Sequence, residues 1–126
     1  CVLTHLLHTA TEVNTVGKIL FIEDIGEYNY AIDRMLVQWK RSGKLASLAG
    51  LVVGQFTDCK DGFAPYGKNA FEIIHEHTAS YKYPICFDFP AGHVTDNRPL
   101  LIGVNATLGV DATCTTLQFH SSEMII

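Results

Sequence analysis

The acidic pair Glu23-Asp24 and the histidine His93 are the residues of this chain whose types and positions could do chemistry. Each follows an apolar segment and lies beside turn-forming residues, Gly26 after the acids and a Pro-Ala-Gly sequence before the histidine. A carboxylate can orient an imidazole, and the imidazole can then take a proton from a nucleophile. If the fold brings residues 23 and 93 together, they form two members of a nucleophilic triad.

The strands decide whether these side chains can meet. Short apolar runs bounded by turn residues are typical of strands buried on both faces. The sequence has three such runs, at 18–23, 51–56 and 84–89. Helices are predicted between them, at 30–41 and at about 69–81, from apolar residues at helical spacing. This alternation predicts a parallel sheet, in which the carboxyl ends of the strands share one edge.

That edge would receive polar residues from all three strands. They are Glu23 and Asp24 from the first strand, Gln55, Asp58 and Cys59 from the second, and His93 from the third. Ligands and chemistry gather at this edge in open α/β sheets. The alternative is that the two acids are solvated turn residues, with Asp24 capping the next element.

The two ends of the chain differ from this core. Residues 2–13 predict a short helix or the end of one, and because the pattern starts in mid-helix without a methionine, we expect a piece of a longer protein. The last third predicts a hairpin turn at 109–111 and short strands, which are 100–102, 104–108 and 115–119. The predicted fold class is α/β, with a parallel βαβαβ core followed by a small antiparallel sheet.

Length and composition limit the classes of function. The 126 residues are enough for one domain, and a hydrophobic share of 48% is ample for a packed core. A net charge of −4 without a basic run argues against nucleic acid as a partner. No apolar stretch is long enough to span a membrane, and the N-terminus lacks the features of a signal peptide. The four cysteines form no CxxC pair, so we expect neither a zinc site nor a disulfide framework.

A nucleophile for the predicted pair is harder to find. No GxSxG elbow is present. The serines lie near predicted helix ends or in the C-terminal tail, at Ser42, Ser47, Ser80, Ser121 and Ser122. Cys59 is the only internal candidate, but no cationic neighbour is evident to activate it, so a loop thiol is favoured. Glu72, His75 and Glu76 have a spacing that can ligate a metal, although a polar helix face is the favoured interpretation.

Three blocks of the sequence resemble one known family. They are GKILFIEDIGEYNYAIDRML at 17–36, LAGLVVGQFTDC at 48–59 and YPICFDFPAGHVTDNRPLLIGVNATL at 83–108. In this order they are similar to the C-terminal domain of the LD-carboxypeptidases, also called muramoyltetrapeptide carboxypeptidases. The resemblance implies serine peptidases that remove the terminal D-alanine from murein tetrapeptides during recycling of the cell wall in the cytoplasm.

The resemblance also implies roles for individual residues. Glu23 matches the glutamate of the family's Ser-His-Glu triad, and His93 matches its histidine. The family's serine lies in an N-terminal domain, so residues 1–126 are expected to be the C-terminal domain alone and to lack peptidase activity. No cofactor or metal is implied. The expected partners are the missing N-terminal domain and a murein peptide, and an exposed apolar docking surface would also allow homodimers.

Two other functions stay open at this point. The family has a sister branch that hydrolyses conjugates of the microcin C type, and the run at 23–36 looks more like the carboxypeptidase branch. The other alternative is a non-catalytic domain that binds ligands or partners at the same strand edge. The resemblance implies a fold similar to the swivelling β/β/α type. A triad remnant requires Glu23 and His93 within hydrogen-bonding distance, about 3 Å.

Overall fold

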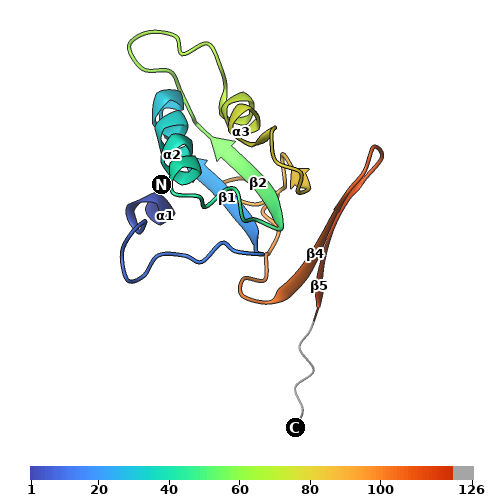
Figure 1. The fold of residues 1–126 in the computed structure, drawn as a ribbon. Helices are drawn as coiled ribbons and strands as arrows, with labels where there is room; N and C mark the ends of the chain where they lie inside the picture. Colours follow the sequence, from blue (N-terminus) through green and yellow to red (C-terminus); the bar gives the residue numbers. More distant parts are fainter. Residues whose placement is uncertain (121–126) are drawn as a thin grey trace.

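The computed structural model describes residues 1–120 and consists of two sheets and three helices (Figure 1). The elements in chain order are α1 (Val2–His5), β1 (Ile19–Ile25), α2 (Asn29–Arg41), β2 (Gly50–Thr57), α3 (Ala70–Thr78), β3 (Ile85–Cys86), β4 (Asn105–Val110) and β5 (Thr115–His120). Strands β1, β2 and β3 form a parallel sheet in that order, and β4 and β5 form an antiparallel pair. The predicted α/β class, a parallel core followed by a small antiparallel sheet, is confirmed.

The core lies between the parallel sheet and the helices α2 and α3. Alternate residues of β2, Leu51 and Val53, are fully buried and belong to the same apolar cluster as Ile32 of α2 and Ile74 of α3. Side chains alternate across a strand, so this cluster defines one face of the sheet. The residues between β3 and β4 lie on the other face of β1 and β2. None of the helices within residues 1–120 combines the length and apolar character needed to cross a membrane.

Two predicted elements are shorter in the structure than in the sequence pattern. The strand predicted at 84–89 has only two residues, and the left-handed backbone of Asp88 (φ 58°) interrupts the extended geometry shortly after it. The helix predicted at 2–13 ends at His5, and His8 also has a left-handed backbone (φ 62°). Such backbone geometry ends regular structure, and periodicity alone does not reveal it.

The C-terminal third corrects two further predictions. Residues 100–102 form no strand, and the chain turns at Gly103 with φ 83°. The hairpin turn lies at 111–114 rather than at 109–111, because β4 continues to Val110. The Asp111 carboxylate accepts hydrogen bonds from the backbone N–H groups of Thr113 and Cys114, which lower the pKa of Asp111 to about 2. A side chain that closes its own turn in this way fixes the hairpin.

A polar contact joins α2 to α3. Asp33 Oδ1 lies 2.6 Å from Nε2 of His77, so Asp33 pairs with the neighbouring helix rather than with the adjacent Arg34. The guanidinium of Arg34 instead lies over the ring of Tyr30. The hydrogen bond to His77 holds the pKa of the Asp33 carboxyl below its usual value of 3.8.

Replacing Asp33 should therefore matter more at neutral pH than in acid. Because the folded pKa of Asp33 is lowered, its charge stabilises the fold above pH 3.8, and this contribution is lost as the pH falls below that value. We expect Asp33→Asn to lower the free energy of unfolding by no more than about 1 kcal/mol at pH 6, as for other partly exposed pairs. Urea unfolding at pH 6 and pH 3 should show the difference shrinking. Asp96→Asn is the control, because the pair of Asp96 with Arg98 is largely exposed, and it should change stability little at either pH.

Candidate active site

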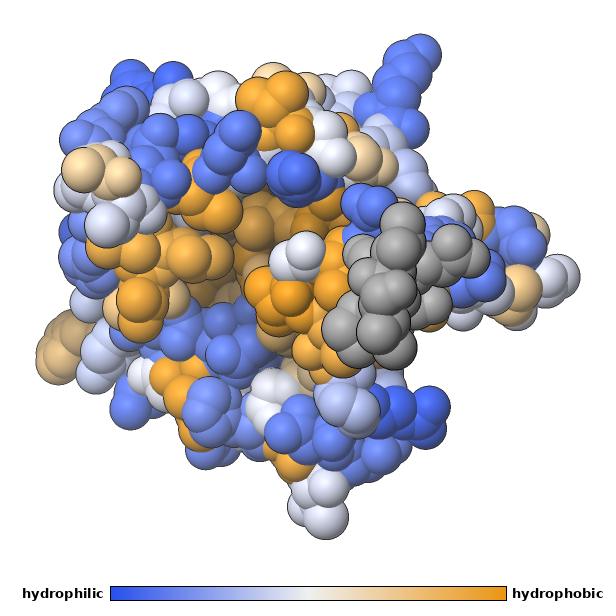
Figure 2. All heavy atoms as spheres, turned by 90° about the horizontal axis from the view of Figure 1, so that it is seen from below, coloured by the Kyte–Doolittle hydropathy of each residue, from blue (hydrophilic) through white to orange (hydrophobic). Residues whose placement is uncertain are grey.

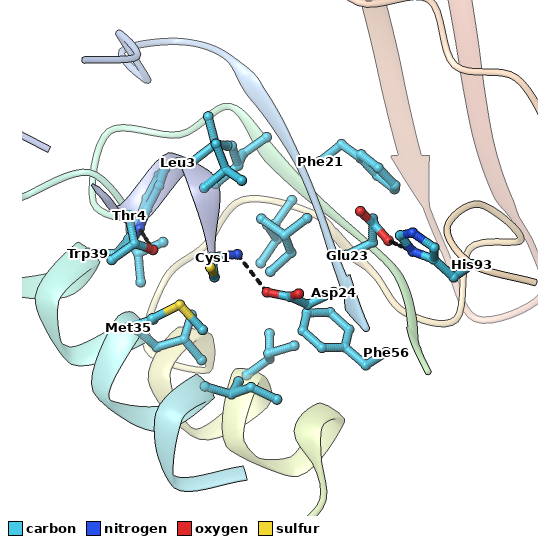
Figure 3. Close-up of a pocket in the computed structure, with 18 residues that line it drawn as sticks. Cys1, Leu3, Thr4, Phe21, Glu23, Asp24, Met35, Trp39, Phe56 and His93 are labelled. Atoms are coloured by element: carbon cyan, nitrogen blue, oxygen red, sulfur yellow. Dashed lines mark hydrogen bonds and ion pairs between the residues drawn. The ribbon is translucent and has the colours of Figure 1, made fainter. Parts of the chain in front are cut away.

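The side chains of Glu23 and His93 meet although they are 70 residues apart in the sequence. Nδ1 of His93 lies 3.0 Å from Oε2 of Glu23 (Figure 3). An ionised carboxylate only accepts hydrogen bonds, so Nδ1 is the donor and Nε2 of the neutral ring carries no hydrogen. The His93 side chain is 55% exposed and that of Glu23 28%. Nε2 is thus free to take a proton from a group presented from outside the domain.

The alternation of side chains along β1 aims Glu23 at this position. Leu20 faces the helices and the core, so Phe21 and Glu23 face the opposite side of the sheet. The pairing with β2 shifts register between Ile22 and Asp24, next to Glu23. In Figure 3 Glu23 points toward His93, whereas Asp24 points to the other side of β1, where its carboxylate lies 2.6 Å from the amino group of Cys1. The side chains of the two neighbouring acids therefore lie on different sides of the strand.

The His93 loop, residues 87–98, lies against β2 by backbone hydrogen bonds. The N–H of Phe89 donates to the carbonyl of Val53, and the N–H of Gln55 donates to the carbonyl of Ala91. The hydroxyl of Thr57 donates to the carbonyl of His93 itself, at 3.3 Å. These contacts continue the interface of β2 after the two-residue β3 has ended. They place His93 over the carboxyl end of the sheet, beside Glu23.

Two glycines allow the His93 loop to lie close to Glu23 and to β2. Gly92 has a φ of 131°, and a Cβ there would lie 3.1 Å from Oε2 of Glu23. At Gly54 of β2, a Cβ would lie 2.5 Å from the carbonyl oxygen of Ala91 and 2.7 Å from the ring of Phe21. Gly54 and Thr57 could not be singled out from the sequence, because contacts between a strand and an irregular loop leave no periodic signal.

The other nucleophile and metal candidates are occupied by structural contacts. Burial raises the pKa of the Cys59 thiol, and nearby carboxylates such as Asp24 add to this effect, so the residue is poorly suited to act as a thiolate. Glu72 forms a capping box with Asn69 at the start of α3, and Glu76 pairs with Lys68. Within residues 1–120, no group of three or more potential metal ligands of the His, Cys, Asp and Glu types is present. Ser121 and Ser122 lie outside the described residues.

A pocket of about 440 Å³ opens beside the pair. Most of its lining comes from α1, α2 and β1, with Glu23 and His93 at its border, and its walls are mostly apolar (Figure 3). Seen from below, the molecule has a hollow with apolar walls, and polar residues lie above and below it in this view (Figure 2). Strand β1 is the outer strand of its sheet, so the pocket lies where the sheet has no further neighbour among the described residues.

Comparison with known families agrees with this geometry. A family model described as the LD-carboxypeptidase C-terminal domain matches residues 1–108. The chain belongs to the LD-carboxypeptidase family. The resemblance seen in the three sequence blocks is thereby confirmed, and both Glu23 and His93 lie in the matched region.

Individual relatives are similar over most of this LD-carboxypeptidase chain. A Bacillus subtilis protein named probable murein peptide carboxypeptidase is 34% identical over 121 residues, which cover 96% of this chain and 38% of that protein. The murein tetrapeptide carboxypeptidase of Pseudomonas aeruginosa is 33% identical over 92 residues, or 73% of this chain and 29% of that one. The chain thus spans less than two fifths of the length of these relatives.

Solved structures of similar proteins share the fold. The crystal structure of muramoyltetrapeptide carboxypeptidase from Oxalobacter formigenes has a TM-score of 0.83 at 30% identity, over 95% of this chain and 42% of that one. A microcin C7 self-immunity protein has a TM-score of 0.58 at 19% identity, over 70% of this chain and 26% of the other. At that identity the second likeness supports the fold alone.

Proposed function

We propose that this domain supplies the histidine and the glutamate of a Ser-His-Glu triad in a serine carboxypeptidase that releases the terminal D-alanine from murein tetrapeptides. The observation that carries the proposal is the hydrogen bond between Glu23 and His93 at the carboxyl edge of the sheet. Relatives named for murein peptides, including the Pseudomonas aeruginosa enzyme, support the substrate class. We place the reaction in the cytoplasm, where the resemblance implies murein recycling.

The geometry suits His93 to act first as general base and then as general acid. The serine oxygen attacks the carbonyl carbon of the peptide bond to the terminal D-alanine. As it does so, Nε2 of His93 takes the proton from the serine hydroxyl. The same nitrogen then gives the proton to the departing amine, which leaves an acyl-enzyme. Water, deprotonated by His93, hydrolyses this ester and regenerates the serine. Glu23 holds the ring with Nδ1 protonated and stabilises the imidazolium that forms in each step.

We further propose that the serine and its oxyanion hole come from polypeptide outside these 126 residues. Two observations support this division. Cys59 is unsuited as a thiolate, and the matched relatives are more than twice as long as the chain. The nucleophile-bearing domain is then the main partner, and the apolar pocket at the outer strand β1 is surface of the kind that such a partner covers. The chemistry requires no metal or cofactor.

The two alternatives receive less support. The microcin self-immunity likeness is lower in identity and covers less of this chain than the carboxypeptidase likeness. A non-catalytic binding domain has no need of an acid held 3.0 Å from the ring nitrogen of a histidine. The carboxypeptidase is therefore the function that the geometry supports best.

A chimera tests the proposal. We expect the 126-residue chain alone to release no D-alanine from murein tetrapeptide, because a triad without its nucleophile retains only weak catalysis. The chimera joins this chain to the residues of the Bacillus subtilis relative that lie outside its matched region. This chimera should release D-alanine. Amino-acid analysis of the products measures both reactions.

Two results would count against this proposal. Turnover by the chain alone would place a nucleophile within it, and alkylation of Cys59 would then identify or exclude that thiol. A folded chimera that binds murein tetrapeptide without cleaving it would favour the binding domain. Sizing of the chain alone should accompany the assay, since an uncovered apolar surface also allows homodimers.

A further inference from the structure

The position of His93 depends on its loop, because its ring is largely exposed. More than half of the side chain is open to solvent, so few packing contacts can fix the ring. In the segment 88–97 the backbone leaves the regular strand geometry at Asp88 and again at Gly92. A loop of this kind keeps one conformation only where side chains or backbone groups form hydrogen bonds with it at several points.

Gln55 holds the part of the loop before His93. Its side-chain Nε2 donates to Oδ1 of Asp88 at 2.8 Å and to the carbonyl of Phe89 at 3.2 Å. Its backbone N–H donates to the carbonyl of Ala91 at 2.9 Å. One residue of β2 thus bonds to three positions of the segment 88–91, including the left-handed Asp88. Two of the three bonds, those to Asp88 and Phe89, need the side-chain amide of Gln55, whereas the bond to Ala91 uses the backbone N–H.

Asn97 holds the loop on the other side of His93. Its Oδ1 accepts a hydrogen bond from the backbone N–H of Gly92 at 3.0 Å, which bridges five residues. Gly92 is the residue whose missing Cβ leaves room for the Glu23 carboxylate. The Asn97 bond therefore acts at the place where His93 and Glu23 approach each other.

We propose that Gln55 and Asn97 are positioning residues, whose side chains hold the His93 loop so that Nδ1 of His93 reaches Glu23. This inference rests on the proposed function for its consequence in catalysis, but the hydrogen bond itself can be measured on the 126-residue chain. Neither residue touches the reacting atoms in the proposed mechanism. We expect these two residues to affect the orientation of the His93 ring and, through it, the rate of turnover.

The test reads the ring tautomer of His93. In the unsubstituted chain at alkaline pH, ¹⁵N chemical shifts should show a protonated Nδ1 and a bare Nε2. Gln55→Met keeps the chain length but removes the donors, and Asn97→Leu removes the acceptor. Both should give a mixture of the two tautomers. Asn97→Asp keeps an acceptor for the Gly92 N–H and should restore the single tautomer. Gln118→Met, at an exposed residue of β5, is the matched control for Gln55→Met.

The active chimera gives the second readout. Gln55→Met and Asn97→Leu should lower kcat by about 10²-fold with KM little changed, since a displacement of about 1 Å in a catalytic group has that cost. Asn97→Asp and Gln118→Met should keep kcat within a few-fold of the unsubstituted chimera. A merely structural role would change the unfolding midpoint and leave the tautomer of the folded fraction unchanged.

The outcomes separate this inference from the proposed function. A single Nδ1–H tautomer in both Gln55→Met and Asn97→Leu would overturn the inference, whatever the chimera does. Failure of both variants to fold would overturn it as well, because the two residues would then serve stability in general. If the tautomer changes as expected but the unsubstituted chimera does not cleave, the proposed function fails and the positioning role stands.

Discussion

Replacing Glu23 by glutamine should lower the kcat of the murein-cleaving chimera by about 10⁴-fold, the effect known for the orienting acid of a serine-protease triad. The amide retains the shape of the carboxylate but loses its charge, and its NH₂ group can turn toward Nδ1. The ring would then carry its hydrogen on Nε2, which could no longer accept the proton of the serine. Initial rates of D-alanine release at saturating tetrapeptide measure the loss.

The neighbouring acid provides the control for this variant. Asp24 points to the other side of β1, toward Cys1 and away from His93. Asp24→Asn should keep kcat within a few-fold of the unsubstituted chimera. Equal losses in the two variants would mean that the acids serve the local fold rather than the histidine. An active Glu23→Gln chimera would remove Glu23 from the proposed triad.

Replacing Gly54 by alanine should destabilise the domain by about 1–3 kcal/mol, the range for overpacking a tight interior. The new Cβ would lie 2.5 Å from the carbonyl oxygen of Ala91, which is backbone and itself accepts the N–H of Gln55. It would also lie 2.7 Å from the ring of Phe21, so the atoms on both sides must move. Denaturant unfolding followed by circular dichroism measures the change in free energy.

Gly50→Ala is the matched control because it lies in the same strand. A Cβ at Gly50 comes within 2.9 Å of Leu108, but the atom it meets is the terminal methyl of a flexible side chain, which can rotate away. We expect this variant to cost clearly less stability than Gly54→Ala. Because the Ala91 carbonyl belongs to the His93 loop, Gly54→Ala should also reduce the activity of the chimera. Equal stabilities of the two variants would contradict the close approach of loop and strand.

The arrangement of strands and helices could largely be predicted from the sequence. The apolar run at 51–56 has residues buried on both faces of the sheet, so it appears as a continuous stretch rather than an alternating one. Of the apolar residues at helical spacing in α2, Ile32, Leu36 and Trp39 are buried and Met35 is partly buried. These patterns are local, because burial of one face of an element depends on residues a few positions apart.

The ends of these elements were predicted less well. The strand at 84–89 and the helix at 2–13 both stop early, at residues near a left-handed backbone, and the hairpin turns at 111–114 because Asp111 bonds to the residues after it. Apolar periodicity carries no information on such backbone angles. The hydrogen bonds of one side chain decide the turn, and several residues near Asp111 could have made them.

The sequence by itself determined the parallel core with its two helices, and that Glu23 and His93 emerge at the same edge of that sheet, since apolar spacing and chain direction are written in consecutive residues. Only the tertiary structure decided that the two side chains meet at 3.0 Å, that Asp24 faces the other way, and that Gly54, Gln55 and Asn97 shape the histidine loop. These features depend on atoms from segments up to 70 residues apart, and their distances are set by packing that no local pattern records.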